Sequence, residues 1–192
     1  MFEIIFSSYM YTEKYSFDSL KFKKHILQTM KEDKKGRVIS NYGGWQSDGF
    51  VKVNSFNKGL FEKINESVNK VQKQLPLKYN LKLQNYWYNV NKFGSSNQLH
   101  HHAEFSDTIV SGVFYITTPK NCGNIIFVNS DELSLPLYES KVQKHNCFTS
   151  SRHMVPASEN MCVLFPAHLN HFVQPNLNKN KHRISISFNY GI

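Results

Sequence analysis

The spacing of apolar residues divides the chain into a helical first part and a strand-rich second part. Residues 17–33 carry apolar side chains at helical spacing, and residues 58–75 place a longer series on one stripe. These series are Leu20, Ile26, Leu27 and Met30, then Leu60, Phe61, Ile64, Val68, Val71 and Leu75. Residues 1–11, "MFEIIFSSYMY", are typical of a strand. Residues 37–50 form a predicted loop with a Gly-Gly turn and an exposed Trp45.

After Pro76 the period changes from helical to alternating, and short segments predict seven or eight strands. They are "LKLQNYWYNVNKF", "QLHHHAEF", "TIVSGVFYITT", "GNIIFVNS", "NMCVLFP", "HFVQPN" and "HRISISFNY". Residues 129–160 form a long irregular stretch. Helices followed by strands without a βαβ rhythm predict an α+β protein built on an antiparallel sandwich or jelly roll. One domain is expected, with residues 1–80 as mainly helical support and residues 81–192 as the β core.

Composition adds few constraints. The chain is 40% hydrophobic, no apolar run reaches the length of a membrane span, and the opening lacks the features of a signal peptide. A cytoplasmic protein is therefore expected, in the host cell if a phage encodes it. Cys122, Cys147 and Cys162 are odd in number and show no CxxC spacing, which favours free thiols.

The net charge of +9, with a pI near 9.4, is compatible with a nucleic-acid partner. Residues 1–96 hold 16 basic and 8 acidic side chains, whereas residues 97–192 hold 7 and 6. The excess therefore falls on the amino-terminal half, away from the histidines discussed next. A nucleic-acid-modifying enzyme is one alternative that this charge keeps open.

Candidate chemistry begins with "QLHHHAE". If this segment is extended, Gln98, His100, His102 and Glu104 share one face, because side chains alternate along a strand. An imidazole and a carboxylate two residues apart can then occupy neighbouring positions around one metal ion. His171, at the start of a later strand, is the candidate third ligand. Two histidines and one carboxylate form the facial triad of non-haem Fe(II) oxygenases.

The last strand carries a second signal. In "RISISFN", Arg183, Ser185, Ser187 and Asn189 lie on one face and the apolar residues on the other. Arg183 and Ser185 resemble a clamp for a carboxylate, since a guanidinium can make a charge-assisted, bidentate contact. An edge strand with a solvated polar face would show the same pattern.

Taken together, these segments resemble the 2-oxoglutarate/Fe(II)-dependent dioxygenases, and most closely an oxygenase family common in marine phages and bacteria. The matching motifs, in chain order, are "GGWQS" at 43–47, "WYN" at 87–89, "HHH" at 100–102, "SGVFY" at 111–115, "FP" at 165–166 with His171, and "RISISFN" at 183–189. The resemblance implies a double-stranded β-helix core, Fe(II), 2-oxoglutarate and O2, with ascorbate as a further cofactor. It also implies release of succinate and CO2 as a substrate is hydroxylated.

Carried over by residue, the resemblance implies His102, Glu104 and His171 as iron ligands. Arg183 and Ser185 would bind the distal carboxylate of 2-oxoglutarate, and Tyr115 and Asn89 would also contact this co-substrate. Family members often show H-x-H-P where this chain has Ala103 and a longer run to "SGV". His100 with His102 is therefore an alternative first pair, and the preference of Fe(II) sites for a carboxylate favours Glu104.

The remaining expectations concern the surroundings of the site and its rivals. The "GGWQS" loop and residues 129–160 are expected to cover the site, with Trp45 as a candidate substrate contact. The substrate could be a protein side chain, a small metabolite or a nucleic acid. A cupin-like metalloenzyme without 2-oxoglutarate, or a catalytically silent jelly-roll module, would account for the same strands.

Overall fold

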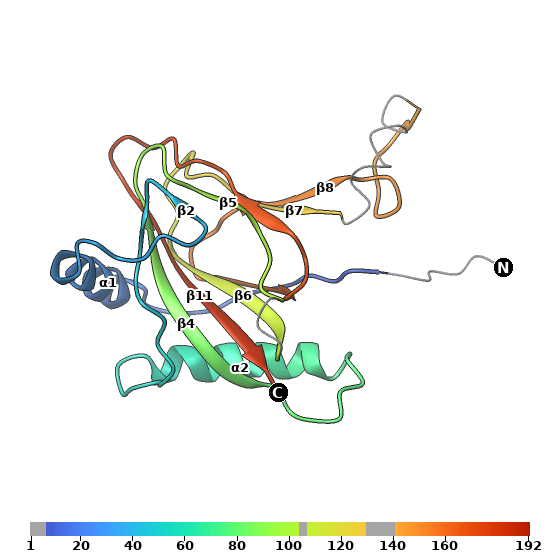
Figure 1. Ribbon diagram of the computed structural model, residues 1–192, viewed down its shortest axis with the longest axis horizontal. Helices are drawn as coiled ribbons and strands as arrows, with labels where there is room; N and C mark the ends of the chain where they lie inside the picture. The colour runs from blue at the N-terminus through green and yellow to red at the C-terminus, as the bar shows by residue number, and fades with distance from the viewer. Residues whose placement is uncertain (1–6, 104–106, 130–140) are drawn as a thin grey trace.

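Two antiparallel sheets and two helices make up the computed structural model, which describes residues 7–103, 107–129 and 141–192 (Figure 1). The six-stranded sheet has the order β1-β9-β6-β11-β4-β3. Its strands are Tyr11–Lys14, Met161–Pro166, Thr108–Thr117, Arg183–Gly191, Lys82–Asn91 and Trp45–Gln46. Strands distant in the sequence are neighbours here, as the central β11 pairs with both β4 and β6.

The second sheet has five strands in the order β2-β5-β10-β7-β8. They are Asn41–Tyr42, Ser96–His100, His171–Val173, Ile125–Val128 and Arg152–Val155. Two facing sheets whose strands interleave along the chain confirm the predicted α+β jelly roll. Among the described residues, no helix combines the length and the apolarity that crossing a membrane requires.

Alternation along β11 gives the six-stranded sheet two unlike faces. Ile184, Ile186 and Phe188 belong to a large apolar core that also contains the buried residues of both helices. Arg183 and Ser185 point the other way, between the sheets, where they line a cavity. The polar face of this strand is therefore interior, and the helices cover the apolar face (Figure 1).

Both predicted helices are confirmed, as α1 (Leu20–Glu32) and α2 (Lys58–Gln72). The α2 stripe is buried as expected. In α1 the buried residues are Phe22 and Ile26, while Leu20 is 56% exposed at the first position of the helix. Leu20 is therefore not a core residue.

The first strand lies later than predicted. It begins at Tyr11 and pairs with the β9 edge of the large sheet, while residues 7–10 form no strand and residues 1–6 lie outside the described part. Glu13 on this strand accepts hydrogen bonds from Ser67 and Lys70 of α2. The strand β1 therefore links the large sheet to α2. The position of this strand depends on those contacts, and the apolar pattern of residues 1–11 does not reveal it.

The prediction of an exposed Trp45 was wrong. Its side chain is 5% exposed, and its indole N–H donates to the carbonyl of Asp33 at 2.6 Å. The segment around it is not a covering loop, because β2 joins the small sheet and β3 the large one. This short crossing closes one edge of the jelly roll, and Trp45 anchors it.

Candidate metal and co-substrate site

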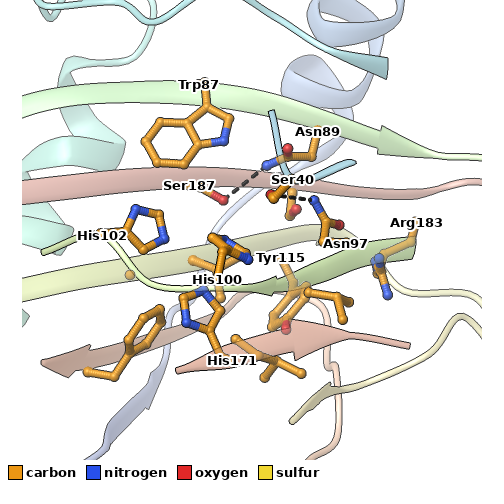
Figure 2. Close-up of a pocket in the computed structure, with 16 residues that line it drawn as sticks. Ser40, Trp87, Asn89, Asn97, His100, His102, Tyr115, His171, Arg183 and Ser187 are labelled. Carbon is orange, nitrogen blue, oxygen red and sulfur yellow. Dashed lines mark hydrogen bonds between the residues drawn. The ribbon is translucent and has the colours of Figure 1, made fainter. Parts of the chain in front are cut away.

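A cavity, partly open to solvent, lies between the two sheets (Figure 2). Three histidines line one side and Arg183 lies on the opposite side. Its polar lining between them includes Asn89, Tyr115 and Ser185 from three neighbouring strands of the large sheet. The predicted iron and co-substrate residues of the described part therefore converge on one space.

His100, His102 and His171 each place a ring nitrogen within 4.8 Å of the others. His100 ends β5 and His171 begins β10, and the two residues are directly paired across the sheet. His102 follows the end of β5, and its backbone N–H donates to the carbonyl of Ala167. The rings of His102 and His171 are parallel within 6°, with centroids 5.2 Å apart.

A β-bulge changes which β5 residues face the cavity. His171 pairs with His100 and Val173 with Asn97, so three steps along β5 match two along β10. Asn97 and His100 consequently line the cavity, and Gln98 is exposed. The expectation that Gln98 shares the histidine face was wrong. Glu104 lies outside the described residues.

Burial favours the neutral form of all three imidazoles, and this is the form that binds a metal ion. Burial, reinforced by the neighbouring histidines, lowers the pKa of His102 to about 3 and that of His171 well below its usual value. Burial likewise lowers the pKa of His100. Nδ1 of His100 donates to the Gln98 carbonyl and Nδ1 of His171 to the Leu169 carbonyl, which leaves each Nε2 as a lone-pair donor.

Arg183 is a buried cation without a carboxylate partner in the described part of the chain. Its Nη1 donates to the carbonyls of Cys122 and Gln174 at 2.8 and 3.3 Å. Burial lowers the pKa of the guanidinium from 12.5, yet arginine stays protonated in proteins. No hydrogen bond of Nε or Nη2 to another described residue accompanies these two, and the side chain lines the cavity. A buried charge in this position calls for an anion.

Further polar groups surround the guanidinium. Burial raises the pKa of Tyr115 to about 12, opposed by the nearby charge of Arg183, so its hydroxyl remains a donor. Ser185 pairs with both Tyr115 and Asn89 across the sheet. Asn89 donates to Ser187 Oγ, and its Oδ1 is buried without a partner among the described residues. The guanidinium and the hydroxyls of Tyr115 and Ser185 can donate to a carboxylate, whereas Oδ1 of Asn89 can only accept from a donor.

Sequence reasoning missed several residues of the cavity. Trp87 lies 5.7 Å from the His102 ring, and Phe165 lies 4.7 Å from the His171 ring. Alternation along β4, which places Trp87 on the same face as Asn89, could have identified the first. Trp45 and residues 141–160 do not line the cavity, so neither of these predicted covers is confirmed, and residues 130–140 lie outside the described part.

Comparison with protein families identifies the family of the chain. Residues 85–189, more than half of the chain, match the family described as "Putative 2OG-Fe(II) oxygenase". The chain belongs to the 2OG-Fe(II) oxygenase family. It is a dioxygenase that uses Fe(II), 2-oxoglutarate and O2, as predicted. No curated protein matches the chain in sequence.

Solved structures show the same fold. A prolyl-4-hydroxylase from Pseudomonas putida has a TM-score of 0.66 at 12% identity, covering 95% of this chain and 91% of its own. The carbocyclase SnoK from nogalamycin biosynthesis has a TM-score of 0.68 at 10% identity, covering 95% and 79%. The collagen prolyl hydroxylase of Paramecium bursaria Chlorella virus-1 has a TM-score of 0.60 at 12% identity, covering 96% and 97%. These likenesses confirm the double-stranded β-helix fold.

Proposed function

We propose that this oxygenase hydroxylates its substrate from a site in which His100, His102 and His171 hold the iron. The convergence of their nitrogens and the fixed tautomers of His100 and His171 support this ligand set. When bound, Fe(II) supplies the activation of O2 that couples conversion of 2-oxoglutarate into succinate and CO2 to hydroxylation. Imidazole nitrogens are suitable ligands for iron.

The sequence left two candidates, His100 and Glu104, for the iron ligand that joins His102 and His171. His100 is supported by its place in the cluster, whereas Glu104 is supported by the preference of Fe(II) for a carboxylate. Iron content per chain after anaerobic loading separates them. His100→Ala should lose bound iron, and Glu104→Ala should retain it.

His101→Ala is the matched control, because His101 is exposed and lies outside the cluster. Retention of iron by His100→Ala together with its loss from Glu104→Ala would return the third position to the carboxylate.

Arg183 is the observation that supports 2-oxoglutarate as the co-substrate at this site. The co-substrate carries a carboxylate at each end, so one end can reach the iron while the other lies against the guanidinium. Nε and Nη2 of Arg183, with the hydroxyls of Tyr115 and Ser185, are the donors available to it. Phe165 and Phe127 pack beside His171 and limit the access of water.

Formation of succinate from 2-oxoglutarate without a primary substrate tests these roles together. Wild-type protein loaded with Fe(II) should form succinate slowly, and His171→Ala should form none. Arg183→Ala should approach the wild-type rate only at much higher 2-oxoglutarate concentration. Equal dependence on 2-oxoglutarate in wild type and Arg183→Ala would exclude the proposed role of the arginine. Iron-dependent activity that needs no 2-oxoglutarate would favour the cupin-like alternative.

We also propose that the enzyme works in a reducing compartment, as the cytoplasm is. The support is that Cys122, Cys147 and Cys162 are all free thiols, and one of them is exposed.

A further inference from the structure

Three loops meet at one end of the jelly roll, at the upper left of Figure 1. They are residues 92–95 between β4 and β5, residues 118–124 after β6, and residues 174–182 before β11. Backbone hydrogen bonds join the first loop to the third at Gly94 and Asn176, and the third to the second at Leu177 and Asn121. The three loops therefore form one connected surface.

This surface carries an excess of positive charge, with Glu159 as an acidic neighbour, whose side chain accepts a hydrogen bond from the backbone of Thr118. Its loops contain Lys92, Lys120, Lys179 and Lys181, all exposed, and no Asp or Glu. None of the ion pairs among the described residues involves these four lysines. Lys23 of α1 adds to it, since the charges of Lys23 and Lys92 both act on His182. We call the four loop lysines, with Phe93, the lysine surface.

An exposed aromatic ring lies within this charge. Phe93 is 53% exposed, and Nζ of Lys179 lies 5.9 Å from the centre of its ring. Its loop is fixed by the hydrogen bonds of Gly94 and Ser95 to Asn176, so the ring is presented by an ordered backbone. The ring therefore offers an accessible aromatic face within a basic surface, and its lysine neighbours favour an anionic partner.

We propose that the lysine surface binds single-stranded nucleic acid. Lysines on such proteins contact the phosphates, while an aromatic ring stacks on a base, and this combination is independent of base sequence. A duplex fits less well, because its bases are already stacked and closed to Phe93. This inference rests on the surface residues alone and is independent of the proposed iron ligands.

Binding of a fluorescein-labelled 15-nucleotide oligo(dT), followed by fluorescence anisotropy, tests the proposal. If the four lysines each contact a phosphate, the slope of log K against log salt concentration should be about −2.8, from about −0.7 per contact on a single strand. Lys92→Glu/Lys179→Glu should raise Kd at least tenfold at low salt and make the slope shallower. Phe93→Ala should raise Kd several-fold without changing the slope.

A matched control lies in the connection that follows α2, residues 73–81, at the lower right of Figure 1. There Tyr79 is 55% exposed and Nζ of Lys78 lies 5.4 Å from its ring centre. Lys73→Glu/Lys78→Glu makes the same change in net charge, and Tyr79→Ala removes the same kind of exposed ring. Both control variants should bind the oligonucleotide with less than a twofold change in Kd, and circular dichroism should show that all variants are folded.

Three results would overturn the proposal. The first is an equal loss of affinity in the control variants, which would assign binding to net charge alone. The second is absence of binding by wild-type protein at low salt. The third is that Phe93→Ala has no effect on Kd and that another polyanion binds at least as well. That polyanion would be a 15-base-pair duplex that binds more tightly, or polyglutamate of the same charge that competes equally. Either result would assign the surface to a polyanion other than single-stranded nucleic acid.

Discussion

Replacing Gly123 by alanine should weaken 2-oxoglutarate binding through Arg183, which the substitution does not touch. Gly123 has a φ of +80°, in the region that favours glycine, and it follows Cys122, whose carbonyl accepts a hydrogen bond from Arg183. A Cβ at position 123 would lie 2.3 Å from the carbonyl oxygen of Gln174, the second acceptor for Arg183. The backbone on both sides of the guanidinium would therefore have to separate.

Gly123→Ala should have two effects, a loss of folding free energy and a rise in the KM for 2-oxoglutarate. An L-residue held at positive φ costs about 1–2 kcal/mol of folding free energy. Loss of a hydrogen bond to a charged group costs about 1.5–3 kcal/mol, so a displaced guanidinium should raise the KM for 2-oxoglutarate by roughly 10- to 100-fold. The kcat at saturating 2-oxoglutarate should change much less, because the histidines are not moved.

Gly94→Ala separates these two effects. Gly94 has a nearly identical φ of +78°, and a Cβ there would meet nothing within 4 Å. It should lose about the same 1–2 kcal/mol of stability from backbone strain, with an unchanged KM. Succinate formation at varied 2-oxoglutarate, together with urea unfolding of both variants, provides the comparison. An equal KM in the two variants would refute the inference that the turn at Gly123 positions Arg183.

Three further predictions concern stability. Gly112→Ala should lower the free energy of unfolding, measured with urea, by about 1–3 kcal/mol. The reason is that the new Cβ would lie 2.4 Å from the Phe188 ring in a tightly packed core. Hydrogen bonds, first from Lys70, lower the pKa of Glu13 from 4.5 to about 2, so its contribution to stability is present above pH 4.5 and lost towards pH 2. The difference in unfolding free energy between wild type and Glu13→Gln should accordingly shrink over this range, and a constant difference would contradict it. Removal of Fe(II) by a chelator should lower the Tm of wild type but not of His171→Ala, as differential scanning fluorimetry under anaerobic conditions would show.

Much of this fold could be predicted because the apolar periods are long and regular. The stripe of α2 and the alternation of β11 depend only on local sequence, and both were confirmed. The inward direction of the polar β11 face followed from chemistry, since Arg183 and Ser185 formed a recognisable clamp. Trp45 was predicted wrongly because its burial depends on the carbonyl of Asp33, twelve residues away.

The histidine cluster was only partly predictable. Strand alternation correctly placed His100 and His102 towards the same space, although β5 ends before His102. The bulge that turns Asn97 inwards depends on pairing with β10, so the sequence of β5 alone does not contain it. For the same reason the position of His171 opposite His100 became visible only in the assembled sheet.

We propose that Arg183 binds 2-oxoglutarate across the cavity from iron held by the histidines. An anaerobic titration of Fe(II)-loaded protein with 2-oxoglutarate, followed by the visible metal-to-ligand charge-transfer band, tests it most directly. Wild type should show a saturable band, and Arg183→Ala should require at least tenfold more 2-oxoglutarate to reach it. Absence of the band from protein shown to contain iron, or identical titrations of the two proteins, would contradict it.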